Sequence, residues 1–435
     1  MKIAFCTLGC KVNQYETEVM REIFQNIGYE IVDENDNPDV FVLNSCTVTA
    51  ESDRKTRQTL RHIRKQNPSC ITVLCGCMAQ AFPDEAYKLD AADIVFGNTD
   101  HKRIPQLVEQ FLNTRERVLA VEKHEQGEKF CTPSISAFSG RTRAYMKIED
   151  GCNRFCSYCA IPYGRGRVRS RSVEDIGKEA ERLSQNGFCE IVLVGINLSA
   201  YGFDNGLTLC DAVSAASKPD GIKRVRLGSL EPDHITDDIL AALFANPKFC
   251  PQFHLSLQSG CNETLKRMNR HYTAEFYEDL VERIRAFGEN AAVTTDVMVG
   301  FSGETDDEFK ESLAFVKKIG FSKCHVFAYS VRNGTAAAKL EGKITRAVKS
   351  QRSEEMIRLA EQLHNEFLKK SLNIPASLLV ETQKDGVCEG YTENYTRVQL
   401  ESDKYLSGDI VKILPYGIKD DMLLAKEIKE ESEKI

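Results

Sequence analysis

The chain has 435 residues, of which 42% are hydrophobic and 28% are charged. This composition is ordinary for a globular protein, and the length allows two or three domains. No apolar run reaches the roughly 20 residues of a membrane span, and the N-terminus turns polar at Lys11 without the apolar core of a signal peptide. We therefore expect a cytoplasmic protein with no membrane partner. The net charge of −7 excludes indiscriminate binding to nucleic acid but not a local basic surface.

The first domain is expected at 1–115, where apolar strand-like runs alternate with helical stretches, as in an open parallel α/β sheet. The expected strands are 2–9, 39–46, 71–77 and 92–97, and the helices between them include 16–27 and 54–66. Three of the strands end near a cysteine, namely Cys10, Cys46, and Cys75 or Cys77. Loops beyond the carboxyl ends of such strands converge on one crevice, so cysteines distant in sequence can meet there.

A polar, irregular linker is expected at 116–140, and the alternation of strands and helices then resumes. The six strand candidates are 143–151, 190–197, 224–230, 252–260, 292–301 and 323–330. Six such units predict a partial (β/α)6 barrel, assigned to 138–370, with its active site at the carboxyl ends of the strands. Near its end an amphipathic helix is predicted, with one apolar face formed by Met356, Leu359, Leu363 and Phe367.

The third domain is expected at 371–435, where short strand candidates are separated by Gly, Asn and Asp turns. This pattern is typical of a small all-β barrel or sandwich. The charged tail from 429 onward is expected to fray.

Sixteen cysteines are present, and in a reducing compartment clustered thiols more often ligate metal than form disulfides. Cys152, Cys156 and Cys159 form a C-x3-C-x2-C pattern just past a strand. Three thiolates on one loop can hold three irons of a [4Fe–4S] cube and leave the fourth iron open. The cysteine motif of a ferredoxin, by contrast, has a full set of cysteine ligands. A zinc knuckle is the alternative, but a structural zinc site requires four ligands. Nine other cysteines are interpreted as small hydrophobic residues, namely Cys6, Cys70, Cys131, Cys189, Cys210, Cys250, Cys261, Cys324 and Cys388.

The spacing of the triplet, at the opening of a barrel, resembles the radical S-adenosylmethionine superfamily. The resemblance implies that the open iron binds S-adenosylmethionine, whose reductive cleavage releases a 5′-deoxyadenosyl radical. It also implies cofactor contacts from residues at the strand ends and in the loop, namely Tyr158, Gly195, Asn197, Ser229, Glu231, Gln258 and Ser259. Individually these residues are weak signals, because Gly and Ser are common at such turns.

Further motifs extend the resemblance over nearly the whole chain and identify it as similar to the methylthiotransferase family. The motifs occur in the order TLGCKVNQYETE, NSCTVTA, GCMAQ, DGCNRFCSYC, LQSG and GFSGETDDEF. The resemblance implies that Cys10, Cys46 and Cys77 hold an auxiliary [4Fe–4S] cluster, with Cys75 as a rival for Cys77. Counting cysteines alone leaves three ordinary buried residues equally acceptable.

The first motif is most similar to the branch of the family that modifies N6-threonylcarbamoyladenosine at position 37 of tRNA. One S-adenosylmethionine is then expected to methylate a sulfur on the auxiliary cluster, and a second to generate the radical that activates C2 of the adenine. This carbon is neither acidic nor electrophilic enough for ordinary acid–base or nucleophilic chemistry. The implied partners are tRNA, a flavodoxin-like or ferredoxin-like electron donor and an unidentified sulfur source.

Three alternatives stay open at this point. Within the same family, the target could be isopentenyladenosine in tRNA or an aspartate of a ribosomal protein. A hypothesis of another class is a non-catalytic iron–sulfur protein that binds RNA. No residue chooses among the substrates within the family on physical grounds.

Two arginine series are candidate RNA contacts, with a plain solvated face as the alternative for each. In the first, arginines at alternate positions would share one face of an extended segment, and these are Arg165, Arg167, Arg169 and Arg171. In the second, four arginines would lie on one side of a helix, and these are Arg54, Arg57, Arg61 and Arg64. The C-terminal module resembles a TRAM domain, a small RNA-binding barrel, in which Tyr391, Tyr395, Arg397 and Tyr405 are either RNA contacts or core residues.

Overall fold

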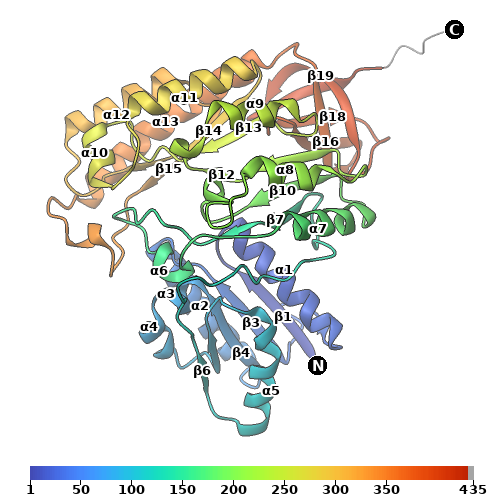
Figure 1. Cartoon of the computed structure of the whole chain (residues 1–435), viewed down its shortest axis with the longest axis vertical. Helices are drawn as coiled ribbons and strands as arrows, with labels where there is room; N and C mark the ends of the chain where they lie inside the picture. Colours follow the sequence, from blue (N-terminus) through green and yellow to red (C-terminus); the bar gives the residue numbers. More distant parts are fainter. Residues whose placement is uncertain (430–435) are drawn as a thin grey trace.

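The computed structural model describes residues 1–429, so all but the first residue of the tail that is expected to fray lies outside the described residues. An α/β sheet unit lies at one end, a larger barrel with outer helices adjoins it, and a small β barrel packs on the side of that larger barrel (Figure 1). Within residues 1–429, every helix is too short or too polar to cross a bilayer.

The N-terminal unit is a parallel six-stranded sheet in the order β2-β1-β3-β4-β5-β6. Its strands are β1 (Lys2–Thr7), β2 (Glu30–Ile31), β3 (Val40–Ser45), β4 (Ile71–Gly76), β5 (Ile94–Phe96) and β6 (Val118–Ala120). The four expected strands are present, whereas β2 and β6 are too short to show a pattern in the sequence. Because β6 pairs with β5, the sheet continues past residue 115 into the segment expected to be a linker.

Helices cover both faces of this sheet (Figure 1). They are α1 (Lys11–Asn26), α2 (Ala50–Gln66), α3 (Cys77–Ala81), α4 (Pro83–Tyr87), the 3-10 turn η1 (His101–Arg103) and α5 (Ile104–Thr114). Side chains of α1 and α5 pack on one face, and those of α2, α3 and α4 pack on the other. α1 begins five residues earlier than the expected 16–27, so its first turn starts immediately after Cys10.

The central unit is the predicted partial barrel, built from parallel strands. The strands are β7 (Ala144–Lys147), β10 (Glu190–Val194), β11 (Arg224–Leu227), β12 (Ser229–Leu230), β13 (Gln252–Leu255), β14 (Ala292–Val299) and β15 (Lys323–Ala328). β11 and β12 flank Gly228 and occupy one position, which gives the six positions expected. The short strands β8 (Glu149–Asp150) and β9 (Arg169–Ser170) pair antiparallel beside the barrel and enclose the C-x3-C-x2-C loop.

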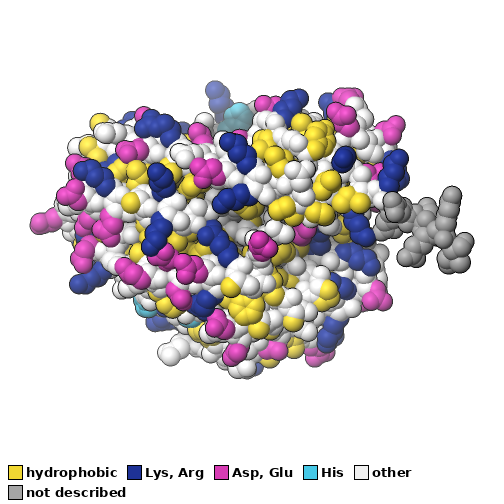
Figure 2. Space-filling model, turned by 90° about the horizontal axis from the view of Figure 1, so that it is seen from above, with side chains coloured by type: hydrophobic (Ala, Val, Ile, Leu, Met, Phe, Trp, Pro, Cys, Tyr) yellow, Lys and Arg dark blue, Asp and Glu magenta, His cyan; other side chains and the backbone are white. Residues whose placement is uncertain are grey.

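Helices cover the outer side of the barrel (Figure 1). They are α7 (Val173–Gln185), α8 (Leu209–Ser217), α9 (Asp237–Ala245), α10 (Asn262–Arg267), α11 (Ala274–Phe287), α12 (Asp306–Ile319) and α13 (Arg346–Lys370). The short helix α6 (Ile161–Arg165) lies instead beside α3 of the N-terminal unit, and the 3-10 turns are η2 (Leu198–Ala200), η3 (Pro232–His234) and η4 (Ala336–Lys339). The expected amphipathic helix is α13, which buries Met356 and Leu363 in the barrel core. Seen from above, the face that includes these helices carries Lys and Arg interspersed with Asp and Glu (Figure 2).

The C-terminal unit is a closed five-stranded barrel in the order β16-β17-β18-β20-β19. Its strands are β16 (Ala376–Lys384), β17 (Val387–Thr392), β18 (Arg397–Glu401), β19 (Ile410–Lys419) and β20 (Met422–Glu427). Arg224 and Arg226 of β11 donate to its Tyr391 and Glu393 carbonyl oxygens at 3.1 and 2.8 Å. The small barrel is therefore anchored to the amino ends of the strands of the larger one.

Candidate functional site

Three cysteines meet at the carboxyl edge of the N-terminal sheet, and we refer to Cys10, Cys46 and Cys77 as the first cysteine group. β1, β3 and β4 are neighbouring parallel strands, so the segments that follow them lie side by side. Cys10 caps α1, Cys46 follows β3 directly, and Cys77 is the first residue of α3. The close approach requires Gly9, which has a φ of +125° and whose Cβ, if present, would lie 2.8 Å from Cys46 Cβ.

Asn13 ties these segments together, although no motif or spacing assigned it a role. Its Nδ2 donates to the carbonyl oxygens of Leu8 and Ser45 at 3.1 and 2.9 Å, at the ends of β1 and β3. Its Oδ1 accepts from Cys10 Sγ at 3.5 Å and lies 3.9 Å from Cys77 Sγ. One amide therefore holds two thiols of the group in position, and its place three residues after Cys10 is the only signal in the sequence.

Arg165 is fully buried against the same group. Its Nε donates to Cys77 Sγ at 3.2 Å, and its Nη2 donates to Asn13 Oδ1 and to Glu16, both at 2.9 Å. Burial acts to raise the pKa of Glu16, but Arg165 and Lys147 outweigh it and lower this pKa to about 2. Burial raises the pKa of the Cys77 thiol to about 12, and Arg165 opposes that shift. A thiolate at Cys77 therefore depends on a neighbouring cation or a bound metal.

Cys75 points away from the first cysteine group. Its Sγ lies 4.0 Å from Met20 Sδ and 3.6 Å from the Leu43 carbonyl oxygen, inside the core between the sheet and α1. Side chains alternate along a strand, and Cys77 has left the strand for α3, so the two thiols take different directions. Of the two rivals, only Cys77 lies with Cys10 and Cys46.

Cys152, Cys156 and Cys159 form the second cysteine group, on the loop between β8 and α6. Nearby N–H groups point at the sulfurs: the Arg154 N–H donates to Cys152 Sγ and the Ile161 N–H to Cys159 Sγ, both at 3.4 Å. Burial raises the pKa values of Cys152 and Cys159 to about 12, and the other thiols of the group add to the shift. The sulfurs of Cys152 and Cys159 therefore both lie near the sulfur of Cys156.

Two residues expected at strand ends meet beside this group, together with Glu149. The Asn197 N–H donates to Glu149 Oε2 at 2.8 Å, and Asn197 Nδ2 lies 3.9 Å from Cys152 Sγ. Gly195 is required here, because a Cβ at this position would lie 2.5 Å from Glu149 Oε2. Burial raises the pKa of Glu149 well above its usual range.

Buried acceptor atoms without a partner mark the same strand ends. Within residues 1–429, they include Glu149 Oε1, Asn197 Oδ1 and Gln258 Oε1. Gln258 also has a φ of +69°, which is uncommon for a residue other than glycine. Buried polar atoms normally have hydrogen-bond partners, so these oxygens fit a bound group that carries N–H or O–H donors, and a cationic donor beside Glu149 would also favour its charged form.

Arg270 links two further expected residues to the second cysteine group, and no pattern in the sequence singled it out. Its Nη1 donates to Cys156 Sγ at 3.3 Å and to the Tyr158 hydroxyl at 3.5 Å. The same guanidinium forms a two-pronged ion pair with the carboxylate of Glu231, at 3.1 and 2.5 Å. Tyr158 and Glu231 are thus held beside the cysteines.

Ser229 and Ser259, which were expected to contact the cofactor, are not bonded to the second cysteine group in the described part of the chain. The Ser259 hydroxyl is buried and accepts from the Cys261 N–H at 3.2 Å, before α10. The Ser229 side chain is exposed and lines a cavity of about 740 Å³ between the partial barrel and the C-terminal barrel. No hydrogen bond in residues 1–429 connects either hydroxyl to the second cysteine group.

The two cysteine groups are joined through α3 and α6, which pack against each other. A Cβ on Gly164 of α6 would lie 3.3 Å from Ala81 Cβ of α3, and Asn98 Nδ2 donates to the Gly164 carbonyl oxygen at 2.7 Å. α6 begins two residues after Cys159 and ends at Arg165, which contacts Cys77. The spatial relation between the groups is therefore fixed by one buried helical turn.

The prediction that the alternating arginines contact RNA is wrong for Arg165 and Arg169, because both are buried. Arg169 Nη2 donates to Asp150 at 3.2 Å, and Arg171 is also buried, in an ion pair with Glu179 at 2.6 Å. Only Arg167 is exposed. The expected extended segment is not formed, because Arg165 ends the helix α6, and carboxylates inside the protein hold the three buried arginines.

The second arginine series lies on α2. Arg54 and Arg61 are exposed and Arg57 is half-buried, while Arg64 turns back to pair with Asp93 at 2.5 Å. Arg54 pairs with Glu51 in an exposed contact. These arginines, apart from Arg64, stay accessible on the helix that follows Cys46.

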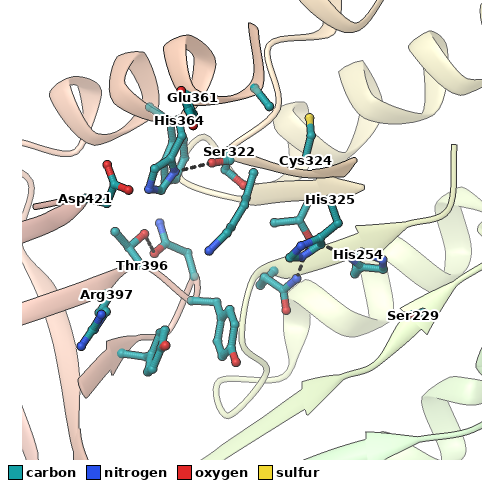
Figure 3. Close-up of a pocket in the computed structure, with 18 of the residues that line it drawn as sticks. Ser229, His254, Ser322, Cys324, His325, Glu361, His364, Thr396, Arg397 and Asp421 are labelled. Carbon is teal, nitrogen blue, oxygen red and sulfur yellow. Dashed lines mark hydrogen bonds between the residues drawn. The ribbon is translucent and has the colours of Figure 1, made fainter. Parts of the chain in front are cut away.

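The cavity is lined by residues from all three units, and Figure 3 shows part of its lining. His254 and His325 lie toward one another from β13 and β15, with ring centroids 5.9 Å apart. His364 of α13 bonds the Ser322 carbonyl oxygen at 2.7 Å on another side of the same space (Figure 3). Lys11, the residue after Cys10, also lines the cavity. The space therefore reaches from the C-terminal barrel toward the first cysteine group.

The aromatic residues expected in the C-terminal unit have partners within the protein. Tyr391 and Tyr395 stack with centroids 4.6 Å apart, and Arg143 lies 4.9 and 5.0 Å from their rings. Arg397 is exposed and pairs with Glu389, and the Tyr405 hydroxyl bonds Glu427. The two stacked tyrosines also line the cavity, so they close it from the side of the small barrel.

The remaining cysteines are thiols without disulfides in the described chain. Cys131, expected to be a buried hydrophobic residue, is instead exposed, because it lies in the irregular segment between the sheet and the barrel. Within residues 1–429, no three His, Cys, Asp or Glu side chains gather closely enough for a single metal ion.

Comparisons with known proteins match both units that carry a cysteine group. Residues 2–97 match the model of the uncharacterized protein family UPF0004, and residues 146–316 match that of the radical SAM superfamily. A relative from Bacillus subtilis, named threonylcarbamoyladenosine tRNA methylthiotransferase MtaB, is 39% identical over 94% of this chain and 93% of its own. An Aquifex aeolicus protein of the same name is 38% identical over 95% of this chain and 100% of its own. The chain belongs to the MtaB-type radical S-adenosylmethionine methylthiotransferases.

Other relatives of this methylthiotransferase carry a different name. A Pelotomaculum thermopropionicum protein named tRNA-2-methylthio-N(6)-dimethylallyladenosine synthase is 33% identical over 96% of each chain. Among solved structures, the methyltransferase TsrM from Kitasatospora setae, with cobalamin and a [4Fe–4S] cluster bound, has a TM-score of 0.58 at 14% identity, over 89% of this chain and 80% of its own. At that identity the likeness establishes the radical S-adenosylmethionine fold. The enzyme class is thus a transferase that uses a [4Fe–4S] cluster and S-adenosylmethionine.

Proposed function

We propose that this enzyme attaches a methylthio group to C2 of N6-threonylcarbamoyladenosine at position 37 of tRNA, using two [4Fe–4S] clusters. The observation that carries the proposal is the pair of cysteine groups, each with three thiols, held in fixed relation by α3 and α6. The names of the two relatives at 39% and 38% identity support the choice of substrate.

The first cysteine group would hold the auxiliary cluster through Cys10, Cys46 and Cys77. The second would hold the other cluster through Cys152, Cys156 and Cys159. The donor sets fit, because three thiols leave one iron of a cube open, and because the thiols of a cube bind separate irons and need not converge on one point. When bound, these groups and S-adenosylmethionine supply a radical that can remove hydrogen from an aromatic carbon, and a sulfur to replace it.

The residues around the second cysteine group would orient S-adenosylmethionine. The partnerless acceptors of Glu149, Asn197 and Gln258 suit its ammonium and hydroxyl donors. Arg270 fixes Tyr158 and Glu231 beside the cysteines, so that an adenine ring could lie against a pre-positioned aromatic ring. Gly195 leaves room for the Glu149 carboxylate, and we keep it, with Ser229 and Ser259, among the proposed cofactor-binding set.

The tRNA would approach across α2 and enter the cavity between the two barrels. Arg54, Arg57 and Arg61 are the accessible basic residues on α2, and Arg167 is the accessible one after the second cysteine group. The C-terminal barrel would serve as a TRAM-type RNA-binding unit. We also propose a cytoplasmic location, and a flavodoxin-like or ferredoxin-like protein as the electron donor, since the chemistry consumes an electron.

Mass spectrometry of tRNA nucleosides from cells that lack the protein tests the substrate. We expect loss of the methylthio mark on threonylcarbamoyladenosine, while the mark on isopentenyladenosine stays. The specific alternative is modification of isopentenyladenosine, because one relative is named a tRNA-2-methylthio-N(6)-dimethylallyladenosine synthase. Loss of the mark on isopentenyladenosine alone would assign the enzyme to that substrate instead.

A further inference from the structure

Lys11 stands between the first cysteine group and the cavity. It is the first residue of α1, immediately after Cys10, and it is half-buried. Its Nζ lies 5.9 Å from the centroid of the Tyr145 ring of β7, and its side chain lines the cavity of about 740 Å³. A cation is therefore placed inside the barrel, one residue from a proposed cluster ligand.

This ammonium has no anionic partner among the described residues, unlike the other cations around it. Arg226 pairs with Glu190 at 2.9 Å, and Arg143 pairs with Glu381 at 2.6 Å. For Lys11, no hydrogen bond or ion pair is formed within residues 1–429. A partly desolvated charge without a partner is unfavourable, so the position favours an anion that arrives with the ligand.

The charges deeper in the barrel do not supply that anion. The Glu190 carboxylate already serves Arg226 and lies 3.5 and 3.9 Å from Arg224 and Arg143. Three guanidiniums thus surround this carboxylate, and Glu381 and Glu393 pair with two of them. These three carboxylates balance the three guanidiniums, so the Lys11 ammonium is the cation left to attract an anion into the space beside the first cysteine group.

We propose that Lys11 binds the carboxylate of the threonylcarbamoyl group and so selects the anionic nucleoside. The inference rests on the proposed function and names the residue that reads its substrate. In adenine, C2 and the carbon bearing N6 flank the same ring nitrogen, so a group on N6 stays close to the reacting carbon. A cavity of about 740 Å³ has room for the threonylcarbamoyl group, while the adenine would lie beside the first cysteine group.

The same contact explains how an uncharged isopentenyl group is rejected. An apolar group in this place would keep the Lys11 ammonium from water without offering a charge or an acceptor. Sites built around a polar group discriminate strongly against analogues that leave it unpaired. The selectivity therefore comes from the cost of the wrong substrate as much as from attraction to the right one.

Two anticodon stem-loop RNAs test the inference, one with the threonylcarbamoyl carboxylate and one with that carboxylate converted to an amide. Their dissociation constants are measured anaerobically with cluster-loaded wild type, Lys11→Met and Lys11→Arg, and iron content is determined for each protein. We expect the wild type to bind the acid at least about tenfold more tightly than the amide, since a charge-assisted contact has about this strength. Lys11→Met should reduce this ratio to about one at unchanged iron content, and Lys11→Arg should retain most of it.

Lys323→Met is the matched control, because Lys323 lines the same cavity from β15. Its ratio of acid to amide affinity should equal that of the wild type. An unchanged ratio in Lys11→Met, or a wild-type ratio near one, would overturn the role of Lys11. Turnover of the acid RNA by the wild type is measured in parallel, and only its failure would count against the proposed function.

Discussion

The two cysteine groups of this methylthiotransferase are assembled in different ways. The second lies on one loop of eight residues, and backbone N–H groups of Arg154 and Ile161 within and beside that loop point at its sulfurs. The first comes from the ends of three strands and depends on Asn13 and on Arg165, a residue of the neighbouring unit. A loop site can thus form from local sequence, whereas a sheet-edge site needs the whole N-terminal unit and its contact with the barrel.

The largest effects are expected when one thiol of each group is removed. Cys156→Ala should abolish formation of 5′-deoxyadenosine, because the second group would lose one of three iron ligands. Cys46→Ala should still cleave S-adenosylmethionine but yield no methylthio product. Chromatography of the small-molecule and nucleoside products measures both. Equal loss of cleavage in the two variants would contradict separate roles for the groups.

The next effect concerns the contact between the units. Arg165→Met leaves the buried Glu16 carboxylate and the Cys77 sulfur without the guanidinium, and breaking such a buried pair costs about 3–5 kcal/mol. We expect a lower thermal midpoint and a loss of iron confined to the first cysteine group. Arg167→Met is the control, since this exposed arginine lies two residues away and its loss should change stability by only about 0.5 kcal/mol. Equal melting and full iron in both variants would refute the role of Arg165.

A smaller effect is the difference in iron content between variants of Cys75 and variants of Cys77. Cys75→Ala removes a buried sulfur from the core and should cost about 1 kcal/mol while the iron content stays full. Cys77→Ala should reduce iron by about half, since one of two cubes would lose a ligand. Iron analysis after anaerobic reconstitution measures both. Loss of iron in Cys75→Ala with none in Cys77→Ala would reverse the assignment.

The smallest effect is expected on α2. Replacing Arg57 and Arg61 with glutamate should weaken tRNA binding a few-fold and lower the slope of log K against log salt by about one or two, because each phosphate contact contributes about one. Lys317 is exposed on α12, a helix of the larger barrel and not of the unit that contains α2, so Lys317→Glu should leave the slope unchanged (Figure 1). Identical slopes for all proteins would show that α2 does not contact tRNA.

Sequence patterns predicted the units and most strands, because apolar runs and their periodicity reflect burial directly. Among the site residues, Cys152, Cys156 and Cys159 were recognisable from spacing alone. Asn13 and Arg270 were not, since a single polar residue gains its role only from neighbours distant in the chain.

The arginines after the second cysteine group show another limit. Their alternate spacing predicts a shared face on an extended segment, but Arg165 lies on a helix, and Arg169 and Arg171 meet the buried carboxylates of Asp150 and Glu179 instead of solvent. Likewise β6 joined the sheet although its three residues carry no readable period. Tertiary contacts decided both outcomes.

The proposed chemistry requires two separate iron-binding groups, and iron content measures their presence most directly. Under oxygen-free conditions, fully loaded wild type should contain about eight irons, and Cys46→Ala and Cys156→Ala should each retain about four, with distinct spectra from the remaining cluster. A wild type that holds only about four irons after careful loading, with all four lost in one variant and none in the other, would contradict it.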